Sequence, residues 1–300
     1  MAGVFLVLLA ALMWAIDTLI RYPLVGKGLD PIVVVFFEHV LLAAVFLPKL
    51  LSAIPRIGEL KLSDAFSFIV VGVVGSALAT VAFTGAFAYL NPSLVILLQK
   101  FQPVVAILLA RLVLGEQVPR PFLLWASVCL VGGVLVSAPD LQQVWELLSQ
   151  NPQNLASDRA VRGYTLVLIS VVGWGATTVF GKKLSLAGFE TTSLMAGRFG
   201  LGFVAMAFVV PWGREMIFAD PMDYARIAAM VVISGLLAMA FYYQGMKRLP
   251  AKLCSILEMF FPLMAIGVNW FILGQQLLEV QLLGGGLLIL GALVLQLKKY

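Results

Sequence analysis

Few side chains inside the long apolar runs of this chain are able to do chemistry. The candidates for ligand binding or proton transfer are Asp17, Glu38, His39, Lys100 and Glu258. A charged side chain at mid-bilayer costs about 2.5–3.5 kcal/mol on insertion scales, so such residues usually face protein or water and mark a substrate or proton path. Both charge signs together suit a zwitterion, because the lysine can hold a carboxylate and an acid can hold an amine.

The first apolar run places an acid and an aromatic ring on one helical face. Trp14, Asp17, Thr18 and Arg21 follow the spacing i, i+3, i+4, i+7. Asp17 could take a substrate amine or a proton, with Trp14 packing against an apolar part of the ligand. Alternatively, Asp17 forms a local ion pair with Arg21 and Trp14 belongs to the core. Trp174 begins a similar face in the second half of the chain, without the charge.

Glu38 and His39 are a second candidate pair, for proton coupling. Histidine has the unperturbed pKa nearest to physiological pH, and an adjacent acid could tune it. Neighbouring helical residues point about 100° apart, however, so the two side chains need not face one cavity. Glu38 could instead pair with Arg198 or another buried cation. A single histidine does not make a metal site, so we expect neither a metal nor another cofactor.

Two prolines interrupt apolar runs four residues after a polar side chain. Pro103 follows Gln99, and Pro262 follows Glu258. Proline has no N–H, so it kinks a helix and frees the carbonyl four residues earlier. Lys100 lies beside the first kink, where it could meet a substrate carboxylate or pair with an acid. Glu258 is a third candidate for proton coupling, although it could simply be paired with a cation.

The composition places these side chains in a membrane. Hydrophobic residues make up 62% of the 300-residue chain and charged residues 12%, with mean hydropathy +1.03. Soluble domains have about 45–50% apolar and about 25% charged residues. The net charge of +5 does not indicate a nucleic-acid partner, because the basic residues lie between apolar runs. The two cysteines fall inside apolar runs and suggest no disulfide framework.

The sequence predicts an all-α integral membrane protein with ten transmembrane helices. A spanning helix needs about 20 mainly apolar residues. A polar linker, 139–161, separates five spans from five. Twelve of the 20 lysines and arginines lie in links on the side shared by the C-terminus, which predicts cytoplasmic N- and C-termini. The ten predicted spans are 3–22, 31–50, 65–89, 92–114, 121–138, 162–182, 191–212, 224–247, 250–273 and 277–297.

The two halves, 1–138 and 162–300, resemble each other. At an offset of 160, LMWAIDTLIRYPLVGKGLDP matches VGWGATTVFGKKLSLAGFET, and at 159, LLQKFQPVVAILLARLVLGEQ matches ILEMFFPLMAIGVNWFILGQQ. Chance similarity between apolar helices is the alternative to duplication. Two tandem copies of five spans must lie in opposite orientations. This 5+5 inverted-topology repeat is a common architecture of secondary transporters, with the site near the midplane.

These features resemble the drug/metabolite transporter superfamily, EamA type. The resemblance rests on the 5+5 duplication, an early tryptophan in each half, and a proline followed by LGE or LGQ in the fourth span of each half. It implies a bacterial inner-membrane carrier of amino acids or other small metabolites, with a cavity lined by spans 1, 3, 4, 6, 8 and 9. Arg198 in span 7 fits the family pattern, whereas the first half has Glu38 and His39 instead.

We therefore expect a monomeric, secondary-active or facilitative inner-membrane carrier that exports small amphipathic metabolites, amino acids first among them, by alternating access. An exporter of hydrophobic cationic drugs, an intramembrane lipid-modifying enzyme and a non-transporting scaffold are the alternatives. The chain has no Walker A, HExxH or GxSxG motif. We therefore expect a small-molecule substrate and no enzymatic activity. The predicted substrate-binding residues are Trp14, Asp17, Gln99, Lys100, Trp174, Tyr243 and Glu258.

Overall fold

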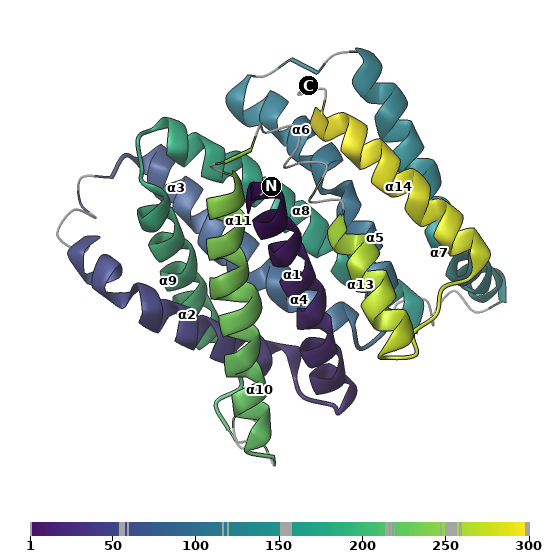
Figure 1. Ribbon diagram of the computed structural model, residues 1–300, viewed down its shortest axis with the longest axis horizontal. Coiled ribbons are helices and arrows are strands. Elements are labelled where there is room, and N and C mark those ends of the chain that lie inside the picture. The colour runs from purple at the N-terminus through teal and green to yellow at the C-terminus, as the bar shows by residue number, and fades with distance from the viewer. Residues whose placement is uncertain are drawn as a thin grey trace.

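The computed structural model is helical throughout the part of the chain that it describes (Figure 1). Among the described residues, eight helices are long and apolar enough to cross a membrane, and two shorter apolar helices follow them. The apolar composition and the length of these helices make the protein a multi-pass membrane protein. The described residues are 2–53, 58, 60–115, 117–118, 120–150, 158–213, 216, 218, 220–246, 248–249, 257 and 260–297.

The helices follow the predicted spans closely where both can be compared. In the first half they are α1 (Ala2–Gly26), α2 (Pro31–Ala53), α3 (Leu62–Ile69), the π-helix η2 (Val70–Leu78), α4 (Ala79–Ala86), α5 (Pro92–Leu98), the 3₁₀ turn η3 (Gln99–Phe101), α6 (Gln102–Leu114) and α7 (Arg120–Gln150). In the second half they are α8 (Arg159–Leu186), α9 (Thr191–Val209), α10 (Met222–Met230), the π-helix η6 (Val231–Leu237), α11 (Ala238–Met246), α13 (Phe260–Phe271) and α14 (Glu279–Leu297).

The end of the fifth predicted span differs from the observed helix end. Helix α7 continues past Ala138 to Gln150, so the first part of the predicted linker is helical. Tyr164 of α8 donates a 2.6 Å hydrogen bond to Asp140, which anchors this extension against the second half of the chain. The ninth predicted span, 250–273, is described mainly in its second part, as α13, so the count of ten spans stays a prediction.

The helices pack in pairs that correspond between the two halves. Helix α1 packs against α11 and α13, while α8 packs against η2, α4 and α6. Helices α2 and α9 pack against each other, and so do α7 and α14, which run side by side at one end of the molecule (Figure 1). At an offset of about 160 residues, α8, α4 and α6 are therefore the counterparts of α1, α11 and α13, and they make corresponding contacts. The same shift relates the two π-helical segments, η2 and η6.

The turns that end helices show the same correspondence. Gly28 and Gly188 have φ of 89° and 94°, and Gly115 and Gly274 have φ of 70° and 67°. Glycine is the usual residue at a left-handed helix end because it has no Cβ to clash there. These pairs are separated by the same 160 and 159 residues as the sequence matches. They are the positive-φ glycines of the described part of the chain.

Candidate functional site

A buried ion network joins α1 to three other elements. The Arg21 guanidinium contacts Asp17 Oδ2 through Nε at 2.7 Å and Glu38 Oε1 through Nη2 at 2.6 Å. Its remaining N–H groups donate to Glu38 Oε2 at 3.0 Å, Asp17 Oδ1 at 3.2 Å and Thr84 Oγ1 at 2.9 Å. All five donors of the guanidinium are therefore used. The partner of Glu38 is Arg21 rather than Arg198, and the local Asp17–Arg21 pair is present.

A serine of the π-helix η6 completes this network. Ser234 Oγ lies 2.7 Å from Asp17 Oδ1 and 2.8 Å from the carbonyl oxygen of Met230. The indole N–H of Trp14 donates to the carbonyl of Ser234 at 3.1 Å. A π-helical turn shifts the backbone register locally, and such turns are frequent at functional sites. Here the turn places Ser234 between the acid and the tryptophan of α1.

His39 is directed away from this network. Its ring nitrogens contact the Val35 carbonyl at 2.8 Å and the hydroxyl of Ser76 on η2 at 3.0 Å. No hydrogen bond joins it to Glu38 among the described residues. The adjacent pair is thus divided between two helix contacts, as the 100° rotation between successive helical residues allows.

The first proline kink is a 3₁₀ turn that holds a polar side chain. The carbonyl of Gln99, which Pro103 cannot bond, accepts the N–H of Gln102 instead, so it is not left for a ligand. The Gln99 side chain donates to Ser170 Oγ on α8 at 2.6 Å and accepts from Gln102 at 3.0 Å. The turn therefore attaches α5 and α6 to the second half of the chain.

An aromatic group surrounds Trp14 on the second-half side. Its ring centroid is 5.5 Å from that of Tyr242 on α11 and 6.4 Å from that of Phe261 on α13. The ammonium of Lys100 lies 5.4 Å from the Phe261 centroid, within the range of a cation–π contact. We call Trp14, Tyr242 and Phe261 the first aromatic group. Of the residues predicted here, Trp14 and Lys100 are thus brought together around one ring.

A second aromatic group surrounds Trp174 on α8. Its ring centroid lies 5.0 Å from Phe83, which is 4.8 Å from Phe87. The Trp174 Nε1 atom is buried, with no hydrogen-bond acceptor among the described residues. Trp14, its counterpart in the first half, uses the same atom to bind η6. We call Trp174, Phe83 and Phe87 the second aromatic group.

The two aromatic groups meet at one small cluster. Phe83 and Phe261, one from each group, both pack against buried Ala15, Ile96 and Ala265. The small side chains of Ala15 and Ala265 let helices approach closely, and both rings pack against the same cluster. The elements concerned are α1, α4, α5 and α13, with α8 and α11 carrying Trp174 and Tyr242. They belong to predicted spans 1, 3, 4, 6, 8 and 9.

Some predicted site residues lie outside the part of the chain that the structure describes. Glu258 is outside the described residues, and so is the side chain of Tyr243. Pro262 lies buried in the first turn of α13. The ring that contacts Trp14 belongs to Tyr242, the neighbour of the predicted tyrosine. Ser234, Ser170 and Ser76 were not singled out from the sequence, although small polar side chains inside apolar runs are a usable signal.

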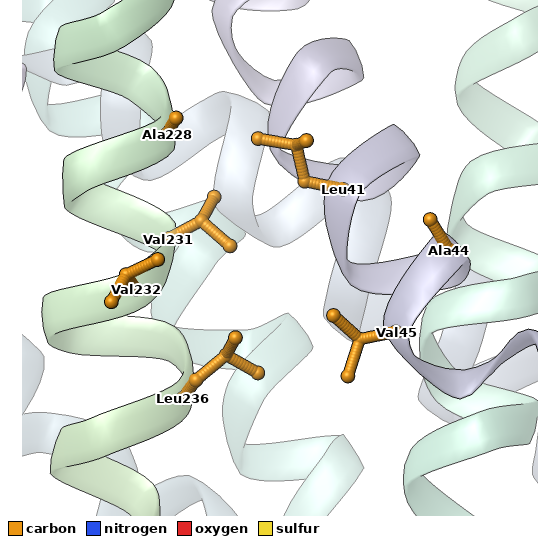
Figure 2. A pocket seen from close by; sticks show the side chains of 7 residues that line it. All are labelled: Leu41, Ala44, Val45, Ala228, Val231, Val232 and Leu236. Carbon is orange, nitrogen blue, oxygen red and sulfur yellow. The ribbon is translucent and has the colours of Figure 1, made fainter.

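An apolar cavity of about 390 Å³ lies between α2 and the α10–η6 segment. Figure 2 shows side chains of the two segments facing each other across it. Val45 and Val232 on its rim are 52% and 46% exposed, so the cavity opens toward the outside of the helix bundle. It is lined by Leu41, Ala44, Val45, Ala228, Val231, Val232 and Leu236.

Charge pairs at the helix ends lie outside the core of the bundle. Lys27 after α1 contacts Asp223 at 3.1 Å and Asp220 at 3.8 Å. The backbone N–H of Met222 and the guanidinium of Arg226 hold the pKa of the Asp220 carboxyl below its usual range. These pairs tie the ends of α1 and α10 together around buried Asp223, and the pairs of exposed Asp220 add little stability individually.

Comparison with known proteins assigns the chain to a family. The model of the EamA-like transporter family matches residues 1–138 and 161–297. The chain belongs to the EamA-like transporter family. It is therefore a membrane transporter of small molecules, not an enzyme.

Individual relatives agree with this assignment over nearly the whole length. The riboflavin transporter ImpX of Fusobacterium nucleatum is 29% identical over 297 residues, which cover 96% of this chain and 95% of that protein. Protein LicB of Haemophilus influenzae is 22% identical over 303 residues, covering 98% and 97%. A protein crystal structure superposes with a TM-score of 0.54 at 14% identity, covering 98% and 95%, and supports the fold alone.

Proposed function

We propose that this EamA-like transporter carries a small metabolite with a flat aromatic ring system, and that riboflavin is the first substrate to test. The observation that carries the proposal is the meeting of two aromatic groups at the centre of the bundle, one on each half of the chain. The name of the Fusobacterium relative agrees with it.

The chemistry of the two groups suits a flavin. Offset or edge-to-face contacts between aromatic rings contribute about 0.5–1.5 kcal/mol beyond the area they bury. A flavin ring system also has carbonyl and ring-nitrogen acceptors. The buried N–H of Trp174 offers one donor for them. Riboflavin has no net charge, so it needs no unpaired acid or base in the site.

An amino-acid substrate has less support than the sequence suggested. Asp17 and Glu38, which could have held an amine, are both bound by Arg21. The same bonds argue against a site for hydrophobic cations at these acids. Neither curated relative reported above is named for amino-acid transport. Amino acids and cationic dyes therefore serve as comparison substrates.

Alternating access between two inverted repeats of five spans, 1–138 and 162–300, is the mechanism we propose. The corresponding helix pairs and glycine turns support it. In such carriers one repeat rocks against the other about a central site. Export, a monomeric state, cytoplasmic termini and a bacterial inner-membrane location belong to the same proposal, the termini from the distribution of lysine and arginine.

Uptake into proteoliposomes tests the substrate. Labelled riboflavin, tryptophan, phenylalanine and a cationic dye should be compared in vesicles with and without protein. We expect riboflavin alone to exceed the protein-free background. Trp174→Leu should lower riboflavin flux strongly, while Trp145→Leu, at a ring that is 71% exposed, should not. Riboflavin flux at background, or equal effects of the two variants, would refute the proposal.

A further inference from the structure

The buried ion network has one negative charge too many. Asp17 and Glu38 are two carboxylates, and among the described residues Arg21 is the one guanidinium bonded to them. The three residues are 8%, 6% and 6% exposed. An uncompensated charge in such surroundings is costly, and a buried group neutralises instead by binding or losing a proton. Two carboxylates that share one site rarely ionise together.

The hydrogen-bond partners distinguish the two acids. Both oxygens of Glu38 accept from Arg21, and among the described residues no acceptor is recorded for a proton on Glu38. Asp17 Oδ1 lies 2.7 Å from Ser234 Oγ, which is itself 2.8 Å from the Met230 carbonyl. A hydroxyl both donates and accepts. A proton on Asp17 Oδ1 can therefore donate to Ser234, while Ser234 donates to Met230.

When Asp17 is ionised, the hydrogen bond between Asp17 and Ser234 runs in the opposite direction. Ser234 then turns its single proton from the Met230 carbonyl to Asp17 Oδ1, so Asp17 and Ser234 stay bonded to each other. Protonation thus reverses one hydrogen bond between α1 and η6 without breaking the network. If η6 moves away, a protonated Asp17 loses its acceptor, which favours release of the proton.

The contact between α2 and η6 has room for such a movement. The 390 Å³ apolar cavity separates these two elements on the outer side, with Leu41 opposite Val231 (Figure 2). The Asp17–Ser234 bond and the Trp14–Ser234 bond tie η6 to α1 behind that cavity. Breaking them would release the two hydrogen bonds that hold η6 to α1, while Ile227 and Met230 of α10 would stay packed against α2.

The other titratable groups around α1 do not compensate the charge. His39 lies next to Glu38, but its ring nitrogens contact the Val35 carbonyl and the Ser76 hydroxyl rather than the network. Thr84 and Ser234, which contact the network from α4 and η6, do not titrate near neutral pH. The remaining groups on α1 and the described parts of its neighbours are Tyr22, Tyr224, Tyr242 and the helix-end set of Lys27, Asp220, Asp223 and Arg226. The ammonium of Lys100 lies at the Phe261 ring beside Trp14.

We propose that Asp17 is a proton-binding site, occupied in the arrangement described here, whose proton is released when η6 separates from α1. One proton would then move with each transport cycle. The coupling to transport rests on the proposed function, whereas the occupancy of Asp17 does not.

Infrared spectroscopy tests the occupancy without any substrate. The spectrum of wild type minus Asp17→Asn at neutral pH should contain the C=O stretch of one protonated carboxyl group. Carboxyl-¹³C aspartate should shift this band, and ¹³C-labelled glutamate should leave it in place. Asp64→Asn, at an aspartate that is also 8% exposed, should not remove the band. No band, or a band that moves with the glutamate label, would overturn the assignment.

Proteoliposomes test the coupling. A pH gradient should change riboflavin flux in the wild type at least severalfold and leave the flux of Asp17→Asn unchanged. Wild-type riboflavin flux that does not change with the pH gradient would refute the coupling, whatever the infrared result. Riboflavin flux at background in every arm would instead refute the substrate, and the infrared spectrum would still decide the proton site.

Discussion

Charge counting in the ion network predicts an unusual order of mutant stabilities. Arg21→Met leaves two buried carboxylates with no cation and removes all five guanidinium hydrogen bonds. Removing one partner of a buried ion pair costs about 3–5 kcal/mol. Asp17→Asn instead leaves one carboxylate for one guanidinium, and its amide oxygen still accepts from Arg21. We expect Asp17→Asn to cost no more than about 1 kcal/mol, because the amide replaces a protonated, neutral carboxyl group and can keep its hydrogen bonds.

Equilibrium unfolding in mixed micelles measures both changes in the free energy of unfolding. The matched control is the triple variant Arg21→Met, Asp17→Asn, Glu38→Gln, which carries no charge in the network. It should regain much of the stability lost in Arg21→Met, because the uncompensated charges have gone. The charge argument fails if Arg21→Met is no less stable than Asp17→Asn, or if the triple variant is the least stable of the three.

Two further predictions compare residues of one type in different surroundings. Gly284→Ala should lower the free energy of unfolding by about 1–3 kcal/mol, because the new Cβ would lie 2.6 Å from backbone atoms of α7. Gly286→Ala should be neutral or slightly stabilising, because its Cβ would meet nothing within 4 Å. Equal unfolding midpoints for the two variants would contradict this. Trp174→Phe should weaken riboflavin binding about two- to tenfold by loss of one neutral hydrogen bond. Trp14→Phe should instead lower the free energy of unfolding, because the N–H of Trp14 is bonded to the Ser234 carbonyl. Flavin fluorescence titration measures the change in binding, and equilibrium unfolding measures the change in stability.

Local patterns in the sequence predicted the parts of the site that lie on one helix. The spacing of Trp14, Asp17 and Arg21 put them on one face, and the structure joins the last two in an ion pair. The kink at Pro103 was also predictable, because proline cannot supply the missing N–H. What Gln99 then binds was not, since its carbonyl partner depends on a 3₁₀ turn and its side-chain partner, Ser170, is on another helix.

Contacts between helices could not be predicted from a single sequence. The bond between Arg21 and Glu38 depends on the rotation of α2 against α1, and the role of Ser234 depends on the π-helical turn in η6. Which tyrosine of α11 lies beside Trp14 depends on the rotation of that helix in the same way. Tyr242 contacts Trp14, and the role predicted for Tyr243 stays a prediction. Apolar helices give weak rotational signals because lipid and protein interior are both apolar.

Counterflow in proteoliposomes tests the central claim most directly, because it requires a carrier and identifies what is carried. Vesicles loaded with unlabelled riboflavin and diluted into labelled riboflavin should accumulate the label transiently above its equilibrium level. Unlabelled tryptophan or a cationic dye inside the vesicles should not drive this overshoot. The account predicts an overshoot that Trp174→Leu abolishes. No overshoot with riboflavin, together with one driven by an amino acid or by the dye, would contradict it.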